Sequence, residues 1–278
     1  MNAPESAKIL QVTDTHVAPK GQLIYGIDAR ARLEACIRDI NEHHSDAALC
    51  VFTGDLVNVG GDAEYENLRE ALEFLKVPWR LMAGNHDDRA SMRRAFPGVF
   101  GRGSYIQDLV EIGDVCLLLL DTLVPGKASG YLCEDRLGWI AKKLREIEGR
   151  PTYVFLHHPP LAIGIEYMDG IALTNGSALL SLLAPVKDQI KLVAFGHVHR
   201  PVSGLWHGIP FSACPSLVHQ VALELGPQVV RHLNFNLEPP TYAIIQTGGD
   251  NVVVHQQRYT ENWKTFPRAM ARGEQATA

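Results

Sequence analysis

The chain has 278 residues, of which 46% are hydrophobic and 21% are charged, and this composition excludes collagen, coiled coils and wholesale disorder. The formal net charge of −5 gives no general attraction for nucleic acid or an anionic membrane. No apolar run is longer than that over residues 115–120, which has the length of a strand and is too short to span a bilayer. We therefore expect neither a nucleic-acid polymer nor a membrane among the partners.

The first residues of the chain and its cysteines indicate in which cellular compartment the protein is found. The first residues lack the basic start and the apolar stretch of a signal peptide. The five cysteines are odd in number and form no CxxC pair. Buried, reduced thiols are typical of such a pattern, so we predict a cytoplasmic protein. We expect one domain over residues 1–258 and a polar tail over 259–278.

Strand and helix patterns alternate in the first third of the chain. Apolar runs predict strands over residues 8–12, 47–52 and 79–82, while helical spacing predicts helices over 29–41 and 63–75. This alternation indicates βαβ units, and hence an α/β fold with parallel strand pairing.

The remainder of the chain is richer in β-strand patterns. Residues 105–110 and 115–120 flank Gly113-Asp114, which predicts a hairpin. A helix over 134–147 and a strand over 152–156 follow. A helix capped by Asn175 or Ser177 then runs to 183, and a strand covers 190–195. The β-rich C-terminal portion, 201–258, contains four further predicted strands, near residues 209–213, 229–235, 242–246 and 251–256.

Five predicted strands end in polar residues of a particular kind, and ligands in α/β sheets bind beyond the carboxyl ends of strands. Carboxylate, imidazole and amide oxygen together suit Mn, Fe(II), Zn or Co, and do not suit a structural zinc site. Seven groups with one shared carboxylate can hold two such ions, which can clamp a phosphoryl oxygen. The seven are Asp14, His16, Asp55, Asn85, His157, His197 and His199.

The ordered motifs Asp14-x-His16, Gly54-Asp55, Gly84-Asn85-His86-Asp87, His157 and Gly196-His197-x-His199 resemble the calcineurin-like metallophosphoesterase signature. The resemblance spans residues 9 to about 200. It implies a four-layer α/β/β/α sandwich with mixed sheets.

The resemblance also implies the metal ligands. One divalent ion would be held by Asp14, His16, Asp55 and His199. The other would be held by Asp55, Asn85, His157 and His197, so that Asp55 bridges. Catalysis is then expected from Asp55 and from His86, a histidine that binds no metal and lies near the leaving group. Its tautomer would be held by Asp87 or by a backbone carbonyl.

A finer resemblance is to bacterial cyclic-nucleotide phosphodiesterases and glycerophosphodiesterases. It is carried by His157-His158-Pro159-Pro160, Met168-Asp169 and Asn175. It implies that Tyr25 and His219 lie near the metals and contact substrate together with Asn85 and His86, and that the protein forms a homodimer or a larger homo-oligomer. Purple acid phosphatases have a tyrosine ligand where this chain has Asn58, so two divalent ions fit better than a tyrosinate-bound ferric ion.

Three functions follow from these motifs. The first is a phosphodiesterase that hydrolyses small diesters, such as 3′,5′-cyclic AMP or glycerophosphodiesters, by attack of a metal-bound hydroxide. The second is a phosphomonoesterase or nucleotidase with the same metal centre. The third is an inactive binding scaffold, which the complete ligand set disfavours. Residues 201–258 either complete the core or partly form a cap or subunit interface.

Overall fold

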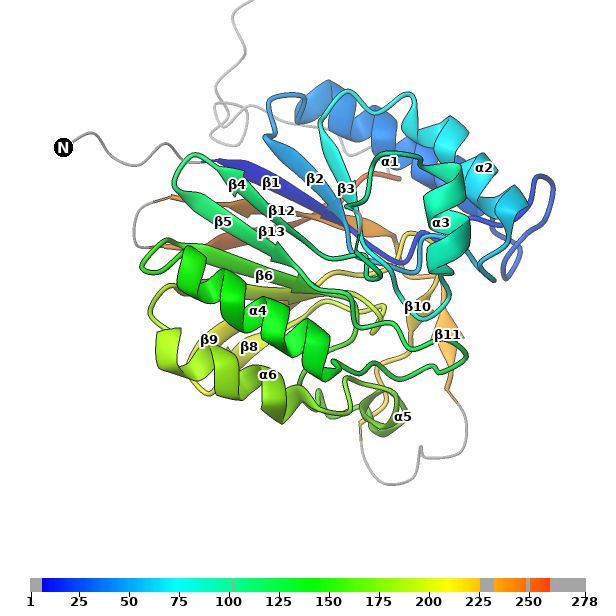
Figure 1. The fold of residues 1–278 in the computed structure, drawn as a ribbon. Helices are drawn as coiled ribbons and strands as arrows, with labels where there is room; N and C mark the ends of the chain where they lie inside the picture. Colours follow the sequence, from blue (N-terminus) through cyan, green and yellow to red (C-terminus); the bar gives the residue numbers. More distant parts are fainter. Residues whose placement is uncertain (1–6, 102, 226–232, 249–250, 261–278) are drawn as a thin grey trace, which may run out of the picture.

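The structure is a computed structural model that describes residues 7–101, 103–225, 233–248 and 251–260. Two β-sheets pack face to face between helices (Figure 1). The first sheet has five strands, in the order β13 (Val253–Arg258), β12 (Thr241–Gln246), β1 (Lys8–Val12), β2 (Leu49–Phe52) and β3 (Trp79–Leu81). The strands β1, β2 and β3 are parallel, whereas β12 and β13 are antiparallel to their neighbours.

The second sheet has six strands and is also mixed. Four parallel strands form its centre, and an antiparallel strand closes each edge. The order is β4 (Asp108–Ile112), β5 (Val115–Leu119), β6 (Thr152–Leu156), β7 (Ile190–Phe195), β9 (Ile209–Ala213) and β8 (Val202–Trp206).

Helices cover the outer face of each sheet, so the predicted four-layer α/β/β/α sandwich is confirmed (Figure 1). The first sheet packs against α1 (Ala29–His43), α2 (Asp62–Leu72) and α3 (Arg89–Ala95). The second sheet packs against α4 (Glu134–Glu146) and α6 (Gly176–Leu183). Three short elements are also present in the described ranges: α5 (Glu166–Gly170), the 3₁₀ turn Ala184–Val186, and a ribbon of β10 (Gln220–Val221) and β11 (Phe235–Asn236).

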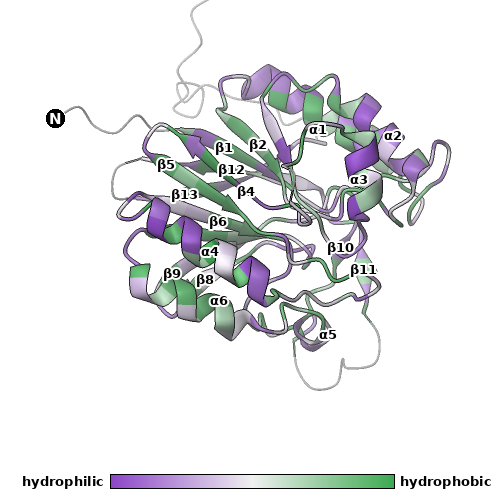
Figure 2. Cartoon of the chain, viewed as in Figure 1, coloured by the Kyte–Doolittle hydropathy of each residue, from purple (hydrophilic) through white to green (hydrophobic). Residues whose placement is uncertain are grey.

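Apolar side chains on both faces of the central strands explain the sandwich. Along β2, Cys50 and Phe52 belong to the core shared with α1 and α2, while Leu49 and Val51 belong to the core between the sheets. Strands buried on both faces read as continuous apolar runs, which is why the sequence shows them clearly. Figure 2 shows hydrophobic strands inside and mixed helix surfaces outside. No helix in the described ranges is long and apolar enough to cross a membrane.

Most predicted elements are present within a few residues, but several are missed or misplaced. The strand predicted at 105–110 begins at Asp108, and α3, α5, β8 and β10 were not predicted. The sequence of β8 contains Gly204, a residue that weakens a strand pattern. A Cβ at this position would lie 3.0 Å from the Phe211 ring of β9, so the ring would have to shift to admit a larger residue. Of the strand predicted at 229–235, residues 229–232 lie outside the described residues.

The C-terminal portion contributes to both sheets. β8 and β9 extend the second sheet, while β12 pairs with β1 and β13 pairs with β12 in the first. These strands therefore complete the core. The β10–β11 ribbon stands apart from both sheets.

Candidate metal centre

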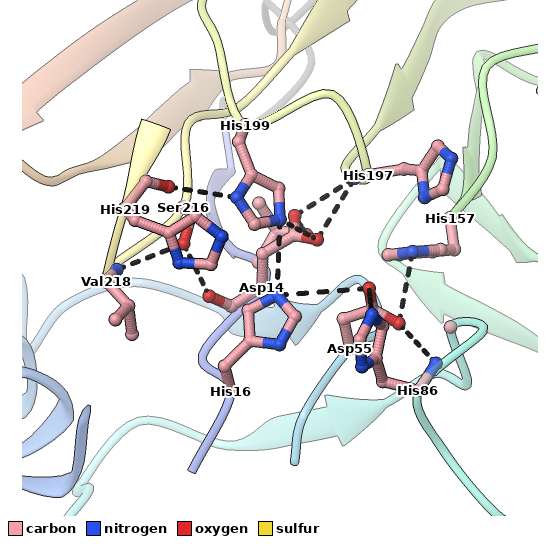
Figure 3. A network of polar contacts seen from close by, with 12 residues as sticks. Asp14, His16, Asp55, His86, His157, His197, His199, Ser216, Val218 and His219 are labelled. Carbon is pink, nitrogen blue, oxygen red and sulfur yellow. Dashed lines mark hydrogen bonds and ion pairs between the residues drawn. The ribbon is translucent and has the colours of Figure 1, made fainter. Parts of the chain in front are cut away.

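Loops from both sheets meet at one end of the sandwich and bring the seven predicted donor residues together. Figure 3 labels all of them except Asn85. They follow β1, β2, β3, β6 and β7. The loops after β1 and β7 are joined directly, since the backbone N–H of His197 donates to Asp14 Oδ2 at 3.0 Å. Five donors have left-handed backbone, with φ between 41° and 67°: Asp14, His16, Asp55, His197 and His199. Such strain clusters at functional sites.

The first donor group comprises Asp14, His16, Asp55 and His199, all buried, with one potential ligand atom each within 4.8 Å of the others. His199 Nδ1 donates to the carbonyl of His219 at 2.9 Å, which leaves the lone pair of Nε2 directed into the group. That Nε2 lies 3.1 Å from Asp14 Oδ1 and 3.2 Å from His16 Nε2. Electron pairs that face one another in a buried space require a cation or a proton between them.

The second donor group comprises Asp55, Asn85, His157 and His197. His157 Nδ1 donates to the carbonyl of Thr53 at 2.8 Å. Its Nε2 faces two oxygens, Asp55 Oδ1 at 3.3 Å and Asn85 Oδ1 at 3.2 Å. The ring of His197 lies 5.1 Å from that of His157, and its buried Nε2 has no hydrogen-bond partner among the described residues. This geometry also fits a cation, and Asp55 belongs to both groups.

His158 lies beside the second donor group but does not belong to it. Its Nδ1 contacts Thr122 Oγ1 at 2.8 Å, and its Nε2 contacts the carbonyl of Ala128 at 3.1 Å. Both ring nitrogens are therefore occupied, and the ring packs against those of His157 and His197.

The protonation states suit a cation-binding site. Burial by itself would raise the pKa values of Asp14 and Asp55, but neighbouring histidines hold both well below their usual range. Burial lowers the pKa of His197 to about 3. The cluster thus offers ionised carboxylates and a neutral imidazole, the forms that bind metal. Burial would also lower the pKa of His157, but the Asp55 carboxylate raises it to about 9. This reversal shows how strongly the position attracts positive charge.

His86 lies at the edge of the two groups, and its side chain is 41% exposed. Its Nδ1 donates to the carbonyl of Asn58 at 2.6 Å, so a backbone carbonyl holds its tautomer. The Asp87 carboxylate serves a different purpose. It accepts hydrogen bonds from the Gly84 and Leu56 amides and from the Tyr65 hydroxyl, and so braces the loop.

Close packing around Asp55 explains why a glycine, Gly84, precedes Asn85 in the sequence. A Cβ on Gly84 would collide with Asp55 Oδ1 and with the Asp55 backbone nitrogen, and would lie 2.8 Å from His157 Cε1. Only glycine allows the two loops to approach this closely.

An open pocket of about 470 Å³ lies over the donor groups. Tyr25 and His219, which the resemblance places near the metals, are among the residues that line it. The His219 ring lies 4.6 Å from that of His199, and the Tyr25 ring lies 4.9 Å from that of His219. Phe235 of β11 also lines the pocket. It belongs to the portion, residues 201–258, that the sequence allowed as part of a cap, but it was not predicted as a site residue. No motif marks this phenylalanine, because only the folding of the ribbon brings it to the site.

The sequence agrees with a known family along most of its length. Residues 7–201 match the family model for calcineurin-like phosphoesterases. The chain is 39% identical to a probable cyclic nucleotide phosphodiesterase of Rhodopseudomonas palustris, over 90% of this chain and 91% of that protein. It is 35% identical to a probable glycerophosphodiester phosphodiesterase of Arcobacter nitrofigilis, over 85% of this chain and 87% of that protein.

The fold agrees as well. A dimetal phosphatase from Danio rerio superposes with a TM-score of 0.63 at 14% identity, covering 91% of this chain and 99% of that structure. The cluster of carboxylates and imidazoles suits divalent metal ions, as the chemistry of its facing electron pairs requires. The chain therefore belongs to the calcineurin-like phosphoesterase family.

Proposed function

We propose that this metal-dependent phosphodiesterase acts on small diesters, such as 3′,5′-cyclic AMP or glycerophosphodiesters, at a centre of two divalent ions. The observation that carries the proposal is the position of Asp55. Its Oδ1 lies 3.3 Å from His157 Nε2, and its Oδ2 lies 4.0 Å from His16 Nε2, so one buried carboxylate faces both donor groups. The two curated relatives, named for cyclic nucleotides and for glycerophosphodiesters, support the choice of substrates.

In this proposal each donor group holds one ion, chosen from Mn, Fe(II), Zn and Co. When bound, the ions neutralise charge on the phosphoryl group and lower the pKa of a water molecule. The residues of the chain orient the reactants. Asp55 belongs to both donor groups. Asn85, a member of the second donor group that also lines the pocket, would contact the phosphate of the substrate.

His86 acts in this proposal as the general acid. Because its Nδ1 proton is committed to the carbonyl of Asn58, Nε2 is the atom that can donate a proton to the leaving alkoxide. Tyr25 and His219, which line the same pocket, contact the remainder of the substrate.

The charge of the pocket favours diesters over monoesters. A monoester dianion gains more than a diester monoanion from a lysine or arginine beside the metals. No lysine or arginine is found among the described residues that line this pocket. Arg200 follows His199 in the sequence, but its Nη1 is bonded to the carbonyl of Val221 at 2.6 Å and to Glu238 at 3.2 Å. A phosphomonoesterase is the second candidate, because the donor groups would serve it equally.

Four expectations from the sequence belong to the same proposal. The inactive scaffold is disfavoured because all seven donors converge. Strands from residues 8–12 and 241–258 share one sheet, which supports a single catalytic unit over residues 1–258. Four of the five thiols are buried and none forms a disulfide, which supports a reducing cytoplasm. Strands at the edges of the sheets, such as β13, support a homodimer or larger homo-oligomer.

One matched assay tests the proposal. The purified protein is loaded with Mn²⁺, and its rates on bis(p-nitrophenyl) phosphate and on p-nitrophenyl phosphate are compared, with Asp55→Ala as the control. A higher diester rate that disappears in the variant is the expected result. A dominant monoester rate would establish the second candidate instead. No turnover with any of the four metals, in a protein that binds two ions, would favour the scaffold.

A further inference from the structure

The rim of the pocket differs from the donor groups below it. Four large apolar side chains line the pocket yet remain substantially exposed: Leu23 at 56%, Tyr25 at 60%, Tyr167 at 45% and Phe235 at 39%. They come from three separate elements, namely the loop after β1, the helix α5 and the strand β11. Large side chains exposed together around a pocket mark a binding surface.

Tyr25 is held at the rim by an unusual turn. The amides and carbonyls of Ile24 and Ile27 exchange two hydrogen bonds, at 2.9 Å and 2.8 Å, which closes a two-residue turn. The central residues have positive φ, 50° for Tyr25 and 81° for Gly26. Such turns favour Asn-Gly, and a bulky residue at positive φ is strained. The chain thus keeps an aromatic side chain in an unfavourable conformation and in contact with water, which points to a function for the ring.

The rings of the rim connect to the donor groups. The Phe235 ring lies 5.4 Å from that of Tyr25, with an angle of 35° between their planes. It lies 4.7 Å from the His219 ring, nearly perpendicular to it. The His219 ring in turn lies 4.6 Å from that of His199. A phosphate at the donor groups would therefore direct its ester substituent along His219 toward Phe235 and Tyr25.

We propose that Phe235, with Tyr25 beside it, forms a stacking platform that selects phosphodiesters with a planar heteroaromatic substituent, such as a nucleobase, over diesters of aliphatic alcohols. This inference rests on the proposed function and narrows its substrate class. Base stacking on an aromatic side chain changes affinity by about 5- to 150-fold. A glycerol or ethanolamine group gains little from the same surface, because the four rim side chains offer it only the Tyr25 and Tyr167 hydroxyls.

Equilibrium binding tests the platform without relying on turnover. Calorimetry on the Mn²⁺-loaded protein compares adenosine 5′-monophosphate with glycerol 3-phosphate, which share a phosphate and differ in the attached group. We expect tighter binding of the nucleotide. Phe235→Ala should weaken nucleotide binding by about 5- to 150-fold and leave the affinity for glycerol 3-phosphate unchanged. Phe235→Leu, which keeps apolar area without a ring, should lose most of the same affinity.

A matched control separates the platform from general damage to the ribbon. Leu237 lies two residues further along, is 54% exposed and does not line the pocket, so Leu237→Ala should bind both ligands as the wild type does. Equal affinity of the wild type for the two ligands would overturn the inference, as would equal losses for both in Phe235→Ala. A change of oligomeric mass in Phe235→Ala with unchanged nucleotide affinity would identify the rim as a subunit interface instead.

Kinetics distinguish failure of the inference from failure of the proposed function. With 3′,5′-cyclic AMP as substrate, Phe235→Ala should raise KM and leave kcat nearly unchanged, while hydrolysis of glycerophosphoethanolamine should not change. If the wild type hydrolyses only monoesters, the proposed function is wrong, and the binding experiment still decides whether the platform exists. If both diesters are hydrolysed and the variant affects neither, the platform alone is wrong.

Discussion

The floor of the pocket, formed by the two donor groups, buries charged and polar side chains, whereas the rim exposes aromatic ones. Asp14 and His157 are completely buried, while Tyr25 is 60% exposed. Strained backbone occurs in both regions, at Asp14 and Asp55 in the floor and at Tyr25 in the rim. Burial of charged groups in the floor and exposure of aromatic rings at the rim both oppose folding.

The difference indicates what each region binds. Buried oxygens and imidazole nitrogens that face one another are stabilised when cations fill the space between them. Exposed aromatic rings are stabilised when an apolar or planar group covers them. The floor therefore determines the reaction, and the rim determines which diester reaches it. The following predictions test this division, beginning with the largest expected effect.

Loss of the shared carboxylate should disable the floor. We expect Asp55→Ala to lose both metal ions and all detectable hydrolysis, because the substitution removes a donor from each group. Metal analysis after desalting measures the first effect. Asp62→Ala is the control, since this exposed aspartate at the start of α2 pairs with Arg94 and belongs to neither donor group. Normal metal content in Asp55→Ala would contradict the bridging position.

Loss of His86 should slow the reaction without removing the ions. The ring touches only the edge of the donor groups, so His86→Ala should retain its metals and lose about 10²–10⁴-fold in kcat. A substrate with a better leaving group should reduce the deficit, because it needs less help from an acid. A variant that loses its metals would place His86 among the ligands.

A single methyl group at Gly84 should disturb the floor through packing. We expect Gly84→Ala to reduce the free energy of unfolding by about 1–3 kcal/mol and to weaken metal binding, because its Cβ would collide with Asp55. Gly138→Ala, on the exposed face of α4, meets no atom within 4 Å. The free energy of unfolding of Gly138→Ala should rise by up to about 1 kcal/mol. Urea unfolding measures the change in both variants. An unchanged Gly84→Ala protein would show that the loops can move apart.

The rim should show the opposite relation between stability and function. Tyr25→Asn places the favoured Asn-Gly pair in the turn, so it should stabilise the protein by up to about 1 kcal/mol while weakening nucleotide binding. Thermal unfolding and calorimetry measure the two effects. Tyr131→Asn is the control, since this tyrosine is 46% exposed and does not have positive φ. Destabilisation by Tyr25→Asn would show that the tyrosine is retained for packing.

The floor was largely predictable and the rim largely was not. The donors follow strands whose apolar runs are easily recognised, and short loops leave them few positions other than the end of the sheets. Phe235 offers no such guide. It lies on a two-residue strand whose partner is β10, and no sequence pattern places that ribbon beside the loop after β1. The sequence allowed a backbone carbonyl as the group that holds His86, but it did not identify that of Asn58, since every residue has a carbonyl.

The sequence by itself determined the alternation of strands and helices, the α/β class, and a set of metal donors at strand ends. These features depend on residues that are close together in the chain. Apolar runs specify buried strands, and ligand types specify a class of metal. Tertiary structure alone decided that β12 lies beside β1, that Asn175 binds the backbone of Leu132 and makes no side-chain cap on α6, and that Tyr25 and Phe235 meet. These contacts join residues far apart in the chain, and their geometry depends on how whole layers pack.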